Sequence, residues 1–215
     1  MPPLAARSTE RAEAVRCVRH GRGVVVVGEA GVGKTALATA VAEEVSGHVG
    51  AVLWTVATAA ARPIPFGALA PLLPADLAGV HPALVPNLVG RRLRELAGDR
   101  PALLVIDDAQ LLDEHSAAAV LTLVTGRGCR VLATVRADSP VSDAVVALWK
   151  DRLLDRLDLA PLDRAGVAAL LADRLGGEVA AGTVELLREH SRGNPLYLTE
   201  LVRFGQGTGR LRREA

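Results

Sequence analysis

The sequence is poor in aromatic residues and in lysine. Aromatic residues make up only 2% of the 215 residues while apolar residues make up 50%, so a buried core must consist of Ala, Val and Leu. Of the 25 basic residues, only Lys34 and Lys150 are lysines. Because arginine is used almost everywhere else, a lysine at position 34 requires a local reason.

The sequence also has few cysteines, no long apolar run and no large excess of basic or acidic residues. Cys17 and Cys129 form no CxxC pair and no metal-binding spacing, which is typical of a protein from a reduced, cytoplasmic compartment. No apolar run approaches the roughly 20 residues needed to span a bilayer. The first residues, MPPLAARSTERAE, lack the apolar centre of a signal peptide. The lack of a long apolar run predicts no membrane partner, and the balance of 25 basic and 24 acidic residues argues against direct nucleic-acid binding by this chain.

Short apolar runs alternate with helical patterns through the first 160 residues. The run Val24 to Val27 is β-branched and shows no alternation with polar residues, which is typical of a strand buried on both faces. Alternating strands and helices predict an α/β fold, in which a parallel sheet carries helices on both faces. The expected strands cover residues 24–27, 50–58, 102–108, 129–136 and 153–159, and the expected helices cover 7–20, 35–45, 84–97 and 116–125.

The pattern changes near Pro161. Residues 163–175, 180–191 and 195–204 each have a helical pattern, and no strand-like run lies between them. The tail GQGTGRLRREA has three glycines and no apolar periodicity. These changes predict an α/β core over residues 1–160, a small helical lid subdomain over 161–205, and a flexible tail or linker over 206–215.

The stretch GEAGVGKT, Gly28 to Thr35, fits the phosphate-binding pattern G-x-x-x-x-G-K-[ST] at every fixed position. Its glycines permit a tight loop whose N–H groups face a phosphate, Lys34 reaches the β/γ oxygens, and the Thr35 hydroxyl can ligate Mg²⁺. A chance glycine-rich turn is the alternative, but a strand before the loop and a helix after it are both predicted. The predicted nucleotide-binding residues are Gly28, Glu29, Ala30, Gly31, Val32, Gly33, Lys34, Thr35 and Ala36.

Two adjacent acids end the apolar run LLVIDD, Leu103 to Asp108. A phosphate-binding loop needs an acid at the end of another parallel strand to hold Mg²⁺. Asp107 follows the apolar run directly, so we predict that Asp107 and Thr35 are the metal-binding residues. Asp108 would then face the γ-phosphate and orient a water, although it has two alternatives: it caps the next helix, or it pairs with an arginine.

The expected strand over residues 129–136 ends in ATVR. In a parallel sheet its end lies beside the strand that carries the two acids, close to the γ-phosphate. Thr134 or Arg136 can therefore sense that phosphate, and Arg136 has the greater length and a charge. An arginine in a surface loop is the alternative. Lys34, Asp108 and Arg136 are the predicted catalytic residues.

Together these motifs resemble a P-loop ATPase of the STAND class (signal-transduction ATPases with numerous domains), which is related to AAA+ proteins. The similarity is greatest to the N-terminal ATPase domain of large LuxR-type transcription regulators, and it covers nearly the whole chain. The stretch VVVVGEAGVGKTALA resembles the Walker A segment, ATVR resembles the sensor strand, and LLVIDDAQLLD resembles the Walker B strand with Asp-Asp where AAA+ machines have Asp-Glu. In SRGNPLYLTEL, which resembles the Gly-x-Pro lid motif, Pro195 is placed near the adenine; the alternative is an ordinary proline at the start of a helix.

The resemblance implies a switch that binds ATP or ADP with Mg²⁺ and hydrolyses ATP slowly in a bacterial signal-transduction protein or transcription regulator. The implied partners are downstream sensor and DNA-binding domains, which would lie beyond this chain, and self-association stays open. The alternatives are an AAA+-like oligomer that hydrolyses ATP steadily, and a module that holds ADP structurally without hydrolysis. No residue reads adenine by a recognisable code, so the choice of base rests on the resemblance alone.

Overall fold

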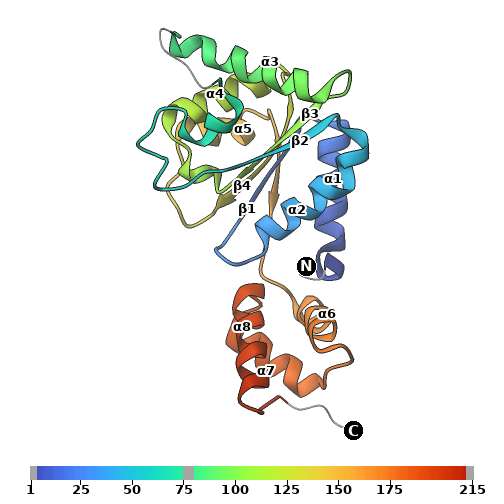
Figure 1. Cartoon of the computed structure of the whole chain (residues 1–215). Coiled ribbons are helices and arrows are strands. Elements are labelled where there is room, and N and C mark those ends of the chain that lie inside the picture. The colour runs from blue at the N-terminus through green and yellow to red at the C-terminus, as the bar shows by residue number, and fades with distance from the viewer. Residues whose placement is uncertain (1–3, 75–79, 212–215) are drawn as a thin grey trace.

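A five-stranded parallel sheet forms the centre of the computed structural model, which describes residues 4–74 and 80–211 (Figure 1). The strand order is β2-β3-β4-β1-β5, and every neighbouring pair is parallel. The predicted α/β class is therefore confirmed. The strands are β1 (Gly23–Gly28), β2 (Ala51–Val56), β3 (Ala102–Asp107), β4 (Arg130–Arg136) and β5 (Asp155–Asp158).

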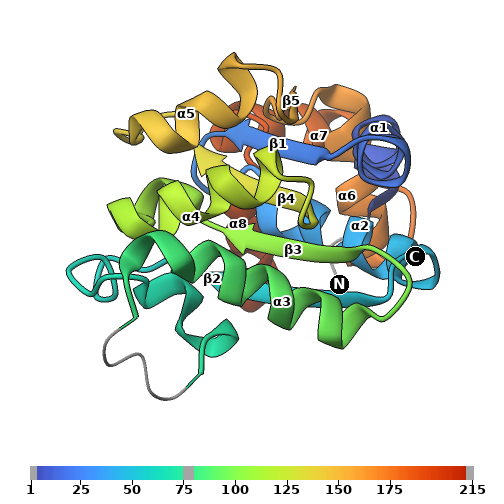
Figure 2. The same cartoon turned by 90° about the horizontal axis from the view of Figure 1, so that it is seen from above.

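Helices cover both faces of the sheet (Figure 2). Two of them, α1 (Ser8–His20) and α2 (Lys34–Val45), pack on one face, and α3 (Val85–Ala97), α4 (Glu114–Thr125) and α5 (Asp143–Lys150) pack on the other. All six residues of β1 are buried, because alternate valines face opposite helical layers. This double burial explains why the valine run shows no polar alternation.

The sequence prediction differs from the structure at several boundaries. It assigned no element to α5, whose apolar side chains Val145 and Leu148 are nevertheless buried in the core. It started α4 at Ser116, whereas the helix begins at Glu114 because the Asp113 side chain caps it by accepting a hydrogen bond from the Ser116 N–H. A short 3-10 helix, Leu4–Arg7, precedes α1, and others lie between the main elements at Ser46–His48, Gly67–Leu72, Pro82–Leu84 and Ala109–Leu111.

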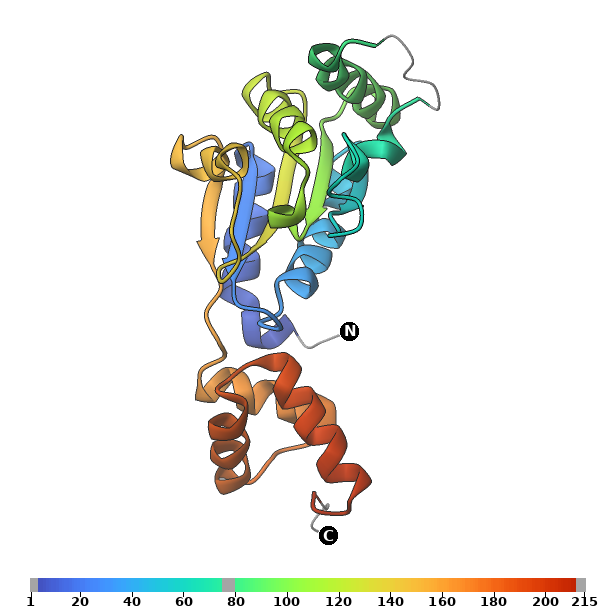
Figure 3. The ribbon, with the colours of Figure 1, turned by 90° about the vertical axis from the view of Figure 1, so that its left-hand side faces the viewer.

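Three further helices form a separate C-terminal part with its own apolar core (Figures 1 and 3). They are α6 (Arg164–Leu175), α7 (Ala181–Ser191) and α8 (Pro195–Gly207). Residues 206 and 207, which the sequence placed in the tail, belong to α8, and Leu211 packs against the apolar core of this part. Residues 212–215 of the predicted tail lie outside the described residues. In the described ranges no helix is both long and apolar enough to cross a membrane.

The strand order brings the functional residues together. β3 and β4 are neighbours, and β4 pairs with β1, so the residues after these three strands meet at one edge of the sheet. The C-terminal helical part lies below this edge in Figure 1, beside the loop that joins β1 to α2.

Candidate functional site

A cleft of about 370 Å³ opens between the P-loop (residues 28–35, joining β1 to α2) and the C-terminal helical part. Its walls combine P-loop residues, two side chains from the ends of β3 and β4, and residues of α6 and α8. The lining residues are Ala30, Gly31, Gly33, Lys34, Thr35, Ala36, Asp108, Arg136, Arg174, Pro195, Leu196 and Thr199.

Backbone geometry at two glycines shapes the P-loop. Gly31 and Gly33 have φ angles of 75° and 104°, in the left-handed region that favours glycine. A Cβ atom at Gly33 would meet nothing within 4 Å, so the loop is open there. The side chain of Val32 between them is fully buried against the sheet and anchors the loop. Residues 31–33 of the loop thus present backbone rather than side chains to the cleft.

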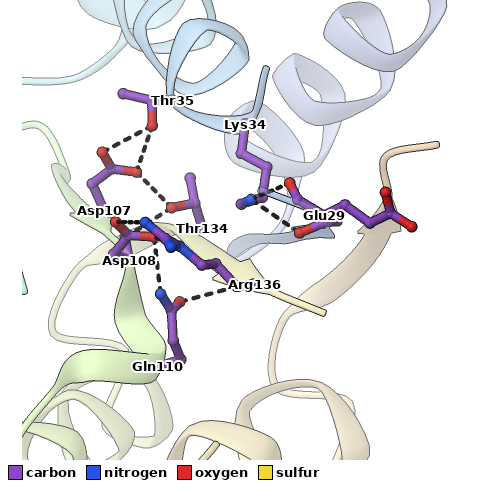
Figure 4. A network of polar contacts seen from close by, with 9 residues as sticks. Glu29, Lys34, Thr35, Asp107, Asp108, Gln110, Thr134 and Arg136 are labelled. Atoms are coloured by element: carbon purple, nitrogen blue, oxygen red, sulfur yellow. Dashed lines mark hydrogen bonds and ion pairs between the residues drawn. The ribbon is translucent and has the colours of Figure 1, made fainter. Parts of the chain in front are cut away.

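Lys34 is folded back onto the P-loop (Figure 4). Its ammonium group donates hydrogen bonds to the carbonyl oxygens of Gly28 and Glu29, at 2.9 and 2.8 Å. The residue is only 7% exposed, and this burial lowers the pKa of the amine below its ordinary value. A phosphate oxygen entering the cleft would offer a charged acceptor in place of a neutral carbonyl, which is the stronger kind of hydrogen bond.

The two residues predicted to bind the metal, Thr35 and Asp107, are in direct contact. The Thr35 hydroxyl lies 3.0 and 2.9 Å from the two carboxylate oxygens of Asp107. Behind them the fully buried Thr134 donates a hydrogen bond of 2.6 Å to the same carboxylate and accepts one of 2.9 Å from the Asp108 N–H. Magnesium in nucleotide sites usually takes one or two protein oxygens together with phosphates and water, so this pair fits the ion chemically.

Asp108 and Arg136 form an ion pair at the mouth of the cleft. The Arg136 guanidinium donates to the two carboxylate oxygens of Asp108 at 3.1 and 3.3 Å. Partial burial acts to raise the pKa of Asp108, but hydrogen bonds from Gln110 and Arg136 and the charges of Arg136 and Lys34 outweigh it and hold the pKa below its usual value. The hydrogen bond to Asp108 in turn raises the pKa of Arg136. The arginine-pairing alternative for Asp108 is therefore the arrangement found in this structure.

The helical part is hydrogen-bonded to the P-loop itself. The Asn194 side chain donates to the Ala30 carbonyl at 2.8 Å, and the Leu196 N–H donates to the Gly31 carbonyl at 3.2 Å. The Asn194 side-chain oxygen also accepts from the Leu196 N–H and so caps α8. Pro195 occupies the first turn of α8, as its alternative reading predicted, and also lines the cleft.

The cleft gathers most of the residues predicted from sequence. Of the predicted nucleotide-binding residues, Gly28, Glu29 and Val32 do not line it, and the metal-site residue Asp107 lies behind Thr35. The Glu29 carbonyl instead holds Lys34, and the Val32 N–H donates to Glu29 at 3.4 Å. The sequence prediction missed the contribution of Gln110 to the network and that of Arg174 and Thr199 to the cleft wall. Only Gln110 had a local signal, as a polar residue between the acids and an apolar pair.

Solved structures with this fold share little sequence with the chain. AMPPCP-bound DnaA from Aquifex aeolicus superposes with a TM-score of 0.61 at 16% identity, over 94% of this chain and 61% of that one. ORC1 of Aeropyrum pernix, solved in complex with DNA, superposes with a TM-score of 0.63 at 19% identity, over 100% of this chain and 62% of that one. A STAND protein with a tetratricopeptide repeat sensor from Pyrococcus horikoshii superposes with a TM-score of 0.55 at 19% identity, over 87% of this chain and 28% of that one. This chain therefore spans less than two thirds of each of them.

These distant structures show the fold alone, whereas a comparison with protein families identifies the family. No curated protein shows a significant match to the sequence. Residues 3–134, more than half of the chain, match the family described as the AAA ATPase domain. This segment contains the P-loop, the two acids and the greater part of β4. The chain belongs to the AAA ATPase domain family, which confirms the prediction of an AAA+-related P-loop ATPase domain.

Proposed function

We propose that the chain is a nucleotide-controlled switch, which binds ATP or ADP with Mg²⁺ in the cleft between the α/β core and the helical part. The observation that carries this proposal is the direct hydrogen bonding between the P-loop and α8. Ala30 and Gly31 are loop residues that a phosphate must approach, and their carbonyls are held by Asn194 and Leu196. A change in the loop on phosphate binding would therefore act on α8 without an intermediary.

In this proposal the cleft would supply a partner for each part of a nucleotide phosphate chain. The P-loop backbone and the first turn of α2 would surround the phosphates, because the leading N–H groups of a helix have no partner within it. Lys34 would exchange its two carbonyl acceptors for phosphate oxygens. Thr35 and Asp107 would hold Mg²⁺, which when bound would supply positive charge to the phosphate oxygens. Pro195 would lie on the side of the base.

The ion pair between Asp108 and Arg136 supports slow rather than rapid ATP hydrolysis. The acid would orient a water only after Arg136 leaves it, while Arg136 and Lys34 would stabilise charge on the transferred phosphoryl group. In this structure Asp108 holds Arg136 rather than standing free. Aspartate is also one methylene shorter than the glutamate of AAA+ machines, so it reaches a water less easily. Both features favour a switch over a steady motor.

The wider context of the switch is proposed by analogy. One structural neighbour is described as a STAND protein with a repeat sensor, and another is in complex with DNA. We propose that residues 1–160 act as the nucleotide-binding core and 161–205 as its lid. The lid position would be read by sensor and DNA-binding domains of a cytoplasmic bacterial regulator of the LuxR type. The nucleotide and its Mg²⁺ would bind to this domain itself, and DNA would be bound by the other domains.

Steady-state turnover measured with and without Asp108→Asn separates the switch from its two rivals. A slow wild-type rate that falls further in Asp108→Asn, with nucleotide binding retained, supports the switch. Rapid turnover that depends on protein concentration would instead indicate an oligomeric motor. Nucleotide binding without wild-type turnover would reduce the domain to a binding module, and unchanged turnover in Asp108→Asn would exclude Asp108 as the acid that orients water.

A further inference from the structure

Gln110 joins the two charged residues at the mouth of the cleft (Figure 4). It lies in the 3-10 turn Ala109–Leu111, and it is only 3% exposed. Its side-chain N–H₂ donates to Asp108 Oδ1 at 2.9 Å, and its side-chain oxygen accepts from the backbone N–H of Arg136 at 3.0 Å. The orientation of the amide is fixed, because a carboxylate can only accept and a backbone N–H can only donate.

The backbones on both sides of Gln110 are also held. Asp108 has a left-handed φ of 55°, and its N–H donates to the Thr134 hydroxyl at 2.9 Å. At the end of β4, the Ala137 N–H donates to the Gly28 carbonyl at 3.1 Å, the same oxygen that accepts from Lys34. The end of β4 is therefore held between Gln110 on one side and the start of the P-loop on the other.

The Arg136 guanidinium can move without breaking this framework, because its hydrogen bonds go to the Asp108 carboxylate and not to Gln110 or the backbone. It is exposed, with 44% of the side chain accessible, and its bonds to Asp108 are an exposed ion pair of the kind that contributes little stability. Among the described residues, the Asp108 carboxylate accepts three hydrogen bonds; if the guanidinium leaves, it loses two of them and retains the one from Gln110. Without Gln110, both hydrogen bonds to the Asp108 side chain would come from Arg136.

We infer that Gln110 is a positioning residue that keeps the Asp108 carboxylate and the Arg136 backbone in place while the Arg136 guanidinium moves from Asp108 to the terminal phosphate of ATP. This inference rests on the proposed function. ADP has no terminal phosphate at that position, so Arg136 stays on Asp108 when ADP binds. Gln110 therefore favours ATP over ADP, although it touches neither.

The first test needs no nucleotide. Gln110→Met keeps the volume of the side chain and removes both hydrogen bonds, and Gln206→Met, at the exposed end of α8, is the matched control. Hydrogen exchange of the Arg136 amide should accelerate by roughly ten-fold in Gln110→Met, the scale expected for one lost hydrogen bond, while Leu132 and Ala133 within β4 stay protected. Unchanged protection of the Arg136 amide would overturn the inference.

The second test compares dissociation constants for Mg-AMPPCP and Mg-ADP. Gln110→Met should weaken AMPPCP binding by roughly ten-fold, as expected for a perturbed hydrogen bond to a charged group, and change ADP binding by less than about two-fold. Equal weakening of both ligands would indicate a merely structural role, and no weakening of either would also overturn the inference.

A second variant, Gln110→Glu, tests the bond to Asp108 separately from the bond to the Arg136 N–H. It also keeps the inference testable if Gln110→Met fails to fold. It keeps an acceptor for the Arg136 N–H but places a second carboxylate beside Asp108, so Arg136 should be held more tightly. We expect wild-type protection of the Arg136 amide together with weakened AMPPCP binding, and normal AMPPCP binding would contradict the inference. If the wild type binds neither ligand, the proposed function fails, and amide exchange still decides whether Gln110 positions Arg136.

Discussion

The Thr35 hydroxyl lies within 3.0 Å of both carboxylate oxygens of Asp107, although 72 positions separate the two residues in the chain. The contact joins the first turn of α2 to the end of β3. It exists because β3 lies two places from β1 in the sheet, so the residues after both strands reach the same edge. A hydroxyl and a carboxylate in contact at the mouth of a P-loop form the protein's half of the proposed Mg²⁺ site.

Asp107→Asn should weaken the effect of Mg²⁺ on nucleotide affinity. The amide keeps the shape of the side chain but loses the charge that the cation requires, so we expect Mg²⁺ affinity in the presence of ADP to fall by about ten-fold or more. Titration of Mg²⁺ against the ADP-bound protein measures this, with Asp151→Asn at an exposed position as the control. An Mg²⁺ affinity equal to that of the wild type would exclude Asp107 from the metal site.

Lys34→Ala should abolish stabilisation by nucleotide. A ligand at about 100 times its Kd stabilises a fold by about 2.7 kcal/mol, which for a domain of this size corresponds to a rise in Tm of roughly 5–11 °C. Thermal melts with Mg-ADP and Mg-ATP should show this rise in the wild type and little of it in Lys34→Ala. Lys150→Ala, which removes the one other lysine at an exposed site, should behave as the wild type. An equal rise in Lys34→Ala would refute the P-loop assignment.

Asn194→Ala should loosen the helical part from the P-loop. The substitution removes both the cap of α8 and the bond to the Ala30 carbonyl, so the helical part should lose about 1–2 kcal/mol of stability. Amide exchange of α8 should accelerate, while that of β3 stays unchanged. Exchange of α8 at the wild-type rate would show that Asn194 does not hold this contact.

Asp113 should make stability depend on pH in the acid range. Burial acts to raise its pKa, but hydrogen bonds from Ser116 and from the Phe66 N–H outweigh burial and lower the pKa in the folded state. A lowered pKa gives stability that is present above the unfolded pKa of about 3.9 and that is lost as the pH falls through the folded value.

The measurement is the difference in Tm between the wild type and Asp113→Ala as a function of pH. Near pH 7 we expect the Tm of Asp113→Ala to be about 2–4 °C below that of the wild type, because the variant loses one helix cap of about 1 kcal/mol. Below about pH 4 we expect this difference in Tm to be smaller. Ser142→Ala is the control, because the Ser142 side chain makes no capping bond to α5. A difference independent of pH would mean that the Asp113 charge contributes nothing.

Local patterns were sufficient for the parts of the site that lie within one strand, loop and helix. The P-loop glycines, Lys34 and Thr35 follow each other in the chain, and their spacing alone predicts the cradle that Gly31 and Gly33 form. Apolar runs likewise predicted β1 and β3, whose six residues are all buried, because a strand buried on both faces has no polar positions. The short helix α5 escaped prediction, since its eight residues give too little periodicity.

The sequence by itself determined the α/β class, the phosphate loop, and the placing of an acid and an arginine at the ends of two strands. The tertiary structure decided which of these residues touch. Arg136 meets Asp108 and Gln110 across 28 and 26 positions, and Asn194 meets Ala30 across 164. Such contacts depend on the order of strands in the sheet and on the docking of α8, which arise from packing of the whole chain and leave no trace in local spacing.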